Sequence, residues 1–123
     1  MDAIRLTKEL QKFEKASEFG IDSYKSLTKA VAEKYGKGSG LEVHHLIEQR
    51  LAKAWGMNVD EIPSVVLTKE EHQVFTNKWR KEIGYINSKA EIKTGNATRE
   101  QIIEAAKEVY KDYPEFLKVL KIH

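Results

Sequence analysis

Three of the four histidines in this 123-residue sequence lie in two short segments. His44 and His45 are adjacent, and His72 lies further along the chain. Imidazole can bind a divalent transition metal and can exchange a proton near neutral pH. Because the chain has no cysteine, a metal ion here would be held by histidine, oxygen ligands and water. Such a site keeps positions open for water and substrate, as a catalytic metal requires. His123, at the chain end, needs no special role.

The residues around the adjacent histidines predict a strand, because apolar and polar positions alternate over Leu41–His45. The glycine-rich segment 36–40 precedes this strand. A flexible loop is its simpler interpretation, and a close approach of its backbone and lysine to a phosphate is the alternative. Further along, the patterns predict a helix over Ile47–Trp55, a connection over 58–63 and a second strand at Val65–Leu67.

A helix after the second strand is expected to carry His72. Thr68 and Glu71 have the spacing of a capping box, which predicts a helix that runs to about Ile83. His72 then lies in the first turn, so a ββα unit can bring His44 and His72 onto one metal ion. Helical spacing places further residues on the face of His72, with the tryptophan in the core: Phe75, Thr76, Trp79 and Ile83.

Helices are also predicted on both sides of this unit. Apolar spacing indicates one over residues 3–18, which Gly20 ends, and a second that begins at Asp22 or Ser23 and ends at Gly36. On the other side, another capping box opens a helix, and a short helix follows a proline; the residues are Thr98, Gln101 and Pro114. Tyr24 and Tyr110 count among the apolar residues of these helices.

The chain length suits one domain, residues 1–123, and the patterns together predict an α+β fold that is mostly helical. Its ββα core is expected at about 40–83, with helical flanks at 3–35 and 98–121. The net charge of +2 is compatible with a polyanionic partner but does not require one. No apolar run is long enough for a membrane span, so no membrane partner is expected. The N-terminus has no signal-peptide pattern, so export would depend on sequence outside this chain.

The run Glu42-Val43-His44-His45, followed by Leu67 and then His72, resembles the HNH or His-Me finger nuclease motif. Bacterial members of that family include the DNase colicins and the C-terminal toxin domains of polymorphic and contact-dependent systems. The resemblance covers about residues 40–83 and leaves out the flanking helices. It implies that His44 and His72 are metal ligands and that His45 is the general base.

Two positions depart from the family pattern. The asparagine that helps to hold the general base is replaced by Pro63, with Ser64 beside it. Either a backbone carbonyl or another residue takes its role, or the base is less well oriented. The further histidine that colicins carry one turn after the helix ligand is Thr76, which offers at best a hydroxyl or a water-mediated contact. With harder oxygen ligands, Mg²⁺ or Mn²⁺ becomes as plausible as Zn²⁺.

Other charged residues are candidates for functional roles, catalytic for Glu48 and Arg50 and supporting for Glu42, and each has a simpler structural alternative. Glu48 could complete the metal shell or orient a histidine, or could simply favour the start of a helix. Glu42 is a similar candidate on the strand face of His44. Arg50 could brace a phosphate by a bidentate contact, or be a solvated helix charge. Three cations could follow a nucleic-acid backbone, although such a run is usually a solvated face: Lys78, Arg80 and Lys81.

The resemblance implies a metal-dependent endonuclease that acts as an antibacterial toxin domain, with DNA as the first choice of substrate and RNA, including tRNA, as the rival. It also implies a cognate immunity protein and delivery as the tail of a larger secreted effector that acts in the target-cell cytoplasm. From a different class, the chain could be a non-catalytic helical interaction module with a structural histidine site, or a nuclease-fold binding protein that has lost activity.

Overall fold

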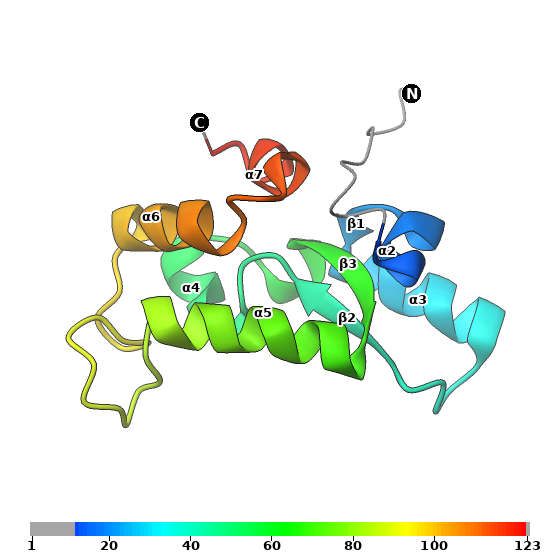
Figure 1. The fold of residues 1–123 in the computed structure, drawn as a ribbon, viewed down its shortest axis with the longest axis horizontal. Coiled ribbons are helices and arrows are strands. Elements are labelled where there is room, and N and C mark those ends of the chain that lie inside the picture. The colour runs from blue at the N-terminus through cyan, green and yellow to red at the C-terminus, as the bar shows by residue number, and fades with distance from the viewer. Residues whose placement is uncertain (1–11, 123) are drawn as a thin grey trace.

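The computed structural model describes residues 12–122, which form an α+β fold of helices around a small antiparallel sheet (Figure 1). This confirms the predicted fold class at the level of α+β with mostly helical content. The elements, with η for 3-10 turns, are α2 (Glu14–Phe19), β1 (Asp22–Ser23), α3 (Tyr24–Tyr35), β2 (Leu41–His45), η1 (Gln49–Leu51), α4 (Ala52–Trp55), η2 (Val59–Glu61), β3 (Pro63–Thr68), α5 (Lys69–Glu82), α6 (Arg99–Val109) and α7 (Pro114–Val119).

The three described strands lie in the order β1-β3-β2, so β3 is central and β2 is an edge strand. β2 and β3 are antiparallel, with His44 opposite Val65 and His45 opposite Ser64. Because side chains alternate along a strand, the two adjacent histidines point to opposite faces of the sheet. β2, β3 and α5 therefore follow one another as two antiparallel strands and a helix, the order expected for residues 40–83.

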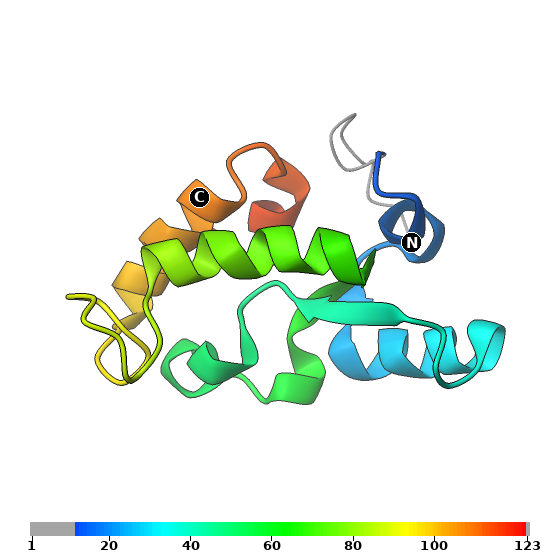
Figure 2. The same ribbon diagram turned by 60° about the horizontal axis from the view of Figure 1, so that its bottom comes forward.

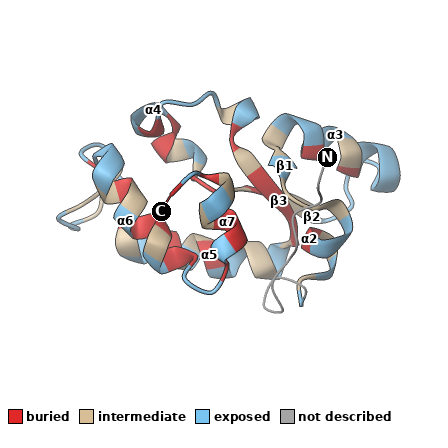
Figure 3. Ribbon diagram, turned by 90° about the horizontal axis from the view of Figure 1, so that it is seen from above, coloured by how far each residue is buried: buried red, intermediate tan, exposed pale blue. Residues whose placement is uncertain are grey.

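Helices cover both faces of the sheet, as Figure 2 shows for α3 and α5. On one face, Leu27 and Val31 of α3 pack with Val66 of β3 in a small apolar cluster. On the other face, Val65 and Leu67 belong to the main core, which also contains buried residues of α5, α6 and α7. Figure 3 shows that the buried residues gather on β3 and on the inner sides of these helices. His44 lies on the α5 face and His45 on the α3 face.

The capping boxes predicted for the two long C-terminal helices are present. The Thr68 hydroxyl accepts a hydrogen bond from the Glu71 backbone N–H at 3.2 Å, and the Glu71 side chain accepts one from the Thr68 N–H at 2.8 Å. Thr98 and Gln101 make the same pair of contacts at the start of α6. Each box satisfies two backbone N–H groups that the first helical turn leaves without partners. The box at Thr68 fixes the start of α5 and therefore the place of His72.

Four expectations about the helices and strands need correction. The helix predicted over Ile47–Trp55 is reduced to the 3-10 turn η1 and the single turn α4, because Glu48 is extended and Leu46 still pairs with β3 through its N–H. The two-residue strand β1 was not predicted, and the connection over 58–63 contains the turn η2. β3 is longer than predicted at both ends. Of the helix predicted over 3–18, residues 3–11 lie outside the described residues, and α2 occupies the rest.

None of the helices formed by residues 12–122 has the length and apolar character needed to cross a membrane.

A polar cluster joins α2 to the end of α3, and it makes stability depend on pH. Glu18 accepts hydrogen bonds from Lys34 at 2.6 Å, from the Tyr35 hydroxyl at 2.7 Å and from Lys15 at 3.1 Å. Lys34, Tyr35 and Lys15, in that order, lower the pKa of Glu18 from 4.5 to about 2. A carboxyl whose pKa is lower in the folded state contributes stability above its unfolded pKa and loses it as pH falls toward the folded value.

We therefore expect the urea midpoint of the wild type to fall between about pH 6 and about pH 3, and that of Glu18→Gln to fall less. Urea titrations at both pH values measure this difference. Glu14→Gln is the matched control, because Glu14 is exposed and lies 4.0 Å from Lys15. If the urea midpoints of wild type and Glu18→Gln fall by the same amount, Glu18 is not the group that makes stability depend on pH.

Candidate metal and catalytic site

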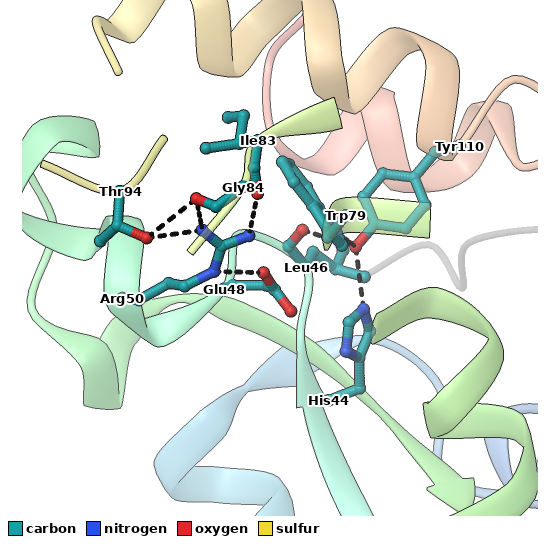
Figure 4. Close-up of polar contacts among 9 residues, drawn as sticks. All are labelled: His44, Leu46, Glu48, Arg50, Trp79, Ile83, Gly84, Thr94 and Tyr110. Carbon is teal, nitrogen blue, oxygen red and sulfur yellow. Dashed lines mark hydrogen bonds and ion pairs between the residues drawn. The ribbon is translucent and has the colours of Figure 1, made fainter. Parts of the chain in front are cut away.

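His44 is buried on the α5 face of the sheet, inside a hydrogen-bonded network (Figure 4). Its Nε2 lies 2.9 Å from the hydroxyl of Tyr110, which is the C-cap residue of α6. The same hydroxyl donates to the Leu46 carbonyl at 2.5 Å and accepts from Trp79 Nε1 at 3.0 Å. Burial lowers the pKa of His44 well below its usual value, and the nearby imidazoles His72 and His45 lower it further. His44 is therefore neutral near pH 7.

His72, in the first turn of α5, is held by Glu42 of β2. The Nδ1 atom of His72 lies 3.0 Å from Oε2 of Glu42. An ionised carboxylate only accepts hydrogen bonds, so Nδ1 carries the proton and Nε2 of a neutral His72 keeps a lone pair. A carboxylate bound to the far nitrogen of an imidazole is the usual support of a metal-binding histidine. Glu42 thus contacts His72 directly, and its supporting role at a metal ion stays a prediction.

The two rings have a spacing that suits a shared metal ion. The ring centroids of His44 and His72 are 5.0 Å apart, with an angle of 62° between the planes. Two imidazoles bound to one ion at about 2.1 Å, with an angle of about 90–110° at the ion, would have centroids about 5 Å apart. Within residues 12–122, however, no three histidine, aspartate or glutamate side chains come together as a ligand set. A bound ion would therefore take its remaining ligands from water and substrate.

His45, on the opposite face, is packed flat against Tyr24 of α3. The two ring centroids are 3.9 Å apart and the planes differ by 14°. Burial lowers the pKa of His45, while a hydrogen bond to the backbone of Val59 opposes this effect. Among the described residues, Nε2 of His45 is the one buried side-chain nitrogen or oxygen without a hydrogen-bond partner.

The residues that replace the family asparagine do not contact His45 through hydrogen bonds of their own side chains. The Pro63 carbonyl accepts a hydrogen bond from the Leu46 N–H at 2.9 Å, which ties the end of β2 to β3. The buried Ser64 hydroxyl donates to the Ile62 carbonyl at 2.9 Å. The His45 ring packs flat against Tyr24, and the group that takes the role of the asparagine stays a prediction.

Glu48 and Arg50 form an ion pair beside the network of His44 (Figure 4). Arg50 Nε donates to Glu48 at 2.8 Å, and its two terminal nitrogens donate to Ile83, Gly84 and Thr94 at 2.7 to 3.0 Å. Burial raises the pKa of Glu48, while Arg50 and His72 oppose this effect. These contacts are those of an anchor at the end of α5. The catalytic roles predicted for both residues stay predictions.

The remaining candidates lie along α5. Thr76 is half-buried one turn after His72. Lys78 lies over the rings of Phe75 and Tyr113, at 5.5 and 5.9 Å from their centroids. Lys78 and Lys81 line a groove of about 190 Å³ beside α6, together with Lys111 and two glutamates. Arg80 is exposed and donates to Asn77. Nucleic-acid contact by these three cations stays a prediction.

A hollow of about 420 Å³ runs along the open edge of β2. Glu42 and His72 line it from the α5 side, and Tyr24 lines it from the α3 side. The glycine-rich loop closes one end, with Lys37 in the lining, so the alternative of a phosphate contact by this loop remains open. The loop itself is confirmed, because segment 36–40 contains no helix or strand. A substrate in this hollow would meet groups from both faces of the sheet.

Sequence reasoning missed two residues that hold the histidines, Tyr24 and Tyr110. Both fell on apolar helix faces, and both were counted as packing residues. A tyrosine on a buried helix face needs a partner for its hydroxyl, and this was the only signal for Tyr110. Nothing in the sequence indicated that its partners would be Leu46, Trp79 and His44.

Comparisons with protein-family models, with curated proteins and with solved structures find no match to this chain.

Proposed function

We propose that this chain is a metal-dependent endonuclease of the HNH type that hydrolyses phosphodiester bonds. The observation that carries the proposal is the approach of His44 and His72 on one face of the sheet, with His45 of the same strand on the other face. His44 and His72 approach each other on one face, each with one nitrogen occupied by a protein partner. His45 lies on the other face, and its buried Nε2 has no hydrogen-bond partner.

His44 and His72 would hold the divalent ion, Mg²⁺, Mn²⁺ or Zn²⁺. Binding of such an ion supplies Lewis-acid stabilisation of the charge that develops on the phosphate and on the leaving oxygen. Thr76 and Glu48 stay predicted candidates for a water-mediated contact to the ion, since the Glu48 carboxylate already pairs with Arg50. Glu42 orients His72 through the hydrogen bond at 3.0 Å.

His45 acts as the general base in this proposal. Nε2 takes a proton from water as the water oxygen attacks phosphorus, the bond to the leaving oxygen breaks, and that oxygen takes a proton from solvent. The stack with Tyr24 holds the ring, and Nε2 is its buried nitrogen without a hydrogen-bond partner. Because Nε2 is buried, a covering group must move before water can reach it. Tyr24 both stacks on the ring and lines the hollow, so its ring is the candidate for this movement.

Substrate class and biological context rest on the resemblance of residues 40–83 to HNH toxin domains. DNA is the proposed substrate, with RNA or tRNA as the alternative of the same chemistry. A cognate immunity protein is the proposed partner, and the proposed route is delivery in a larger secreted effector to the target-cell cytoplasm. The groove beside α6 is lined by both lysines and glutamates, so it does not favour DNA over RNA or RNA over DNA.

A second candidate is a non-catalytic interaction module in which the histidines are structural. The observation in its favour is that His44 and His72 already have protein partners, Tyr110 and Glu42. Cleavage activity separates the two candidates.

The test is a cleavage assay of the purified chain on plasmid DNA and on total tRNA, with Mg²⁺, Mn²⁺, Zn²⁺ or EDTA. We expect metal-dependent nicking of plasmid DNA that EDTA abolishes. Cleavage of tRNA alone would keep the chemistry and change the substrate class. If neither substrate is cut with any of the three metals, the nuclease proposal is wrong and the interaction module becomes the favoured function.

A further inference from the structure

Tyr110 lies outside the ββα segment, at the end of α6, yet its hydroxyl reaches the ring of His44 (Figure 4). A phenol has one proton to donate and two lone pairs to accept with. Three groups surround this oxygen: the Leu46 carbonyl, the Trp79 indole N–H and Nε2 of His44. The number of partners therefore equals the hydrogen-bonding capacity of the hydroxyl.

The proton of the hydroxyl must point to Leu46. A carbonyl oxygen carries no hydrogen, so a contact of 2.5 Å between the two oxygens is favourable only if the phenol donates. The indole nitrogen of Trp79 is a donor only, so it fills one of the two lone pairs. The second lone pair faces Nε2 of His44, and that contact is a hydrogen bond only if Nε2 carries a proton.

This assignment fixes the form of His44. A neutral imidazole has one proton, so a proton on Nε2 leaves Nδ1 as the nitrogen with a lone pair. The buried ring cannot easily exchange this form for the other, because the other form would place two lone pairs against each other and leave the phenol without its second donor. The ring also packs against Phe75, with centroids 5.4 Å apart and planes inclined by 19°.

We infer that Tyr110 is a positioning residue that holds His44 in the Nε2–H form and so presents Nδ1 to a divalent ion. The inference rests on the proposed function for the identity of the bound group, but the proton position stands on the hydrogen bonds alone. Tyr110 then has the same relation to His44 that Glu42 has to His72. Glu42 supports His72 from β2, and Tyr110 supports His44 from the end of α6.

The test uses Tyr110→Phe, which removes the hydroxyl and keeps the ring that packs against Trp79 and Phe116. Long-range proton–nitrogen NMR spectra of the metal-free protein report which imidazole nitrogen of His44 carries the proton. We expect protonated Nε2 in the wild type and a mixture of both forms in Tyr110→Phe. Calorimetric titration with Zn²⁺ alone should show a loss of about 10–100-fold in affinity, as for other residues that support a metal ligand.

Tyr35→Phe is the matched control, because it removes the same atom from a tyrosine of the α2–α3 polar cluster. It should change neither the His44 spectrum nor the Zn²⁺ affinity. A wild-type His44 with its proton on Nδ1 overturns the inference even if Tyr110→Phe fails to fold, and so does a wild type that binds no Zn²⁺. Unchanged spectrum and affinity in a folded Tyr110→Phe overturn it as well. Zn²⁺ binding with the expected losses, but without nucleic-acid cleavage, would leave the inference standing and remove only the proposed nuclease.

Discussion

His45→Ala is expected to lower the rate of plasmid nicking by about 10²–10⁴-fold, the usual contribution of a positioned general base. Zn²⁺ affinity should stay at the wild-type level, because the metal ligands proposed are His44 and His72, on the other face of the sheet. The loss should therefore appear in kcat and not in metal binding. Initial nicking rates at saturating metal, together with a Zn²⁺ titration, measure the two effects separately.

Two variants make this test specific. His45→Gln keeps a polar side chain of similar length against Tyr24, so a rate loss in this variant cannot be assigned to the loss of the stacked side chain alone. His123→Ala removes the same type of side chain from the end of the chain and should leave the rate unchanged. If His45→Ala cuts at the parental rate, His45 is not the base, and the buried Nε2 is only a packing feature.

The parts of the fold that sequence predicts well are those whose signals are local. Both capping boxes were predicted because the two residues of each box are separated by three positions, and the box is formed within one turn. The alternation in Leu41–His45 likewise gave the strand and the opposite directions of His44 and His45. The helix predicted from apolar spacing over Ile47–Trp55 was wrong. Leu46 and Ile47 are both fully buried, but they lie in a segment that still pairs with β3 and is therefore not helical.

The parts that sequence could not provide are contacts between distant residues. The hydrogen bond between His44 and Tyr110 joins positions 66 residues apart, and that between Glu42 and His72 joins positions 30 apart. A single sequence carries no signal for such pairs, because each partner has its own local role in a strand or a helix. β1 was missed for a related reason: two residues are too few for a pattern, and pairing with β3 alone defines the strand.

Arg50→Ala is expected to lower the free energy of unfolding by about 3 kcal/mol, because it leaves the partly buried carboxylate of Glu48 without its cation. The side chains of Arg50 and Glu48 are only 18% and 14% exposed. Arg50 also donates to the Ile83 and Gly84 carbonyls, which lie at the end of α5, where a cation interacts favourably with the helix dipole. Urea unfolding of wild type and variant gives the difference directly.

The same variant separates the two roles considered for Arg50. Arg80→Ala is the control, since Arg80 is exposed and its removal should change stability by at most about 0.5 kcal/mol. A double variant, Arg50→Met with Glu48→Gln, should lose less stability than Arg50→Ala, because no unpaired charge remains. If Arg50→Ala unfolds at the wild-type urea concentration but no longer cleaves DNA, Arg50 braces the phosphate and is not an anchor. A large loss of stability in Arg50→Ala, relieved in the double variant, would assign it to holding the end of α5 and the loop at Thr94 in place beside Glu48.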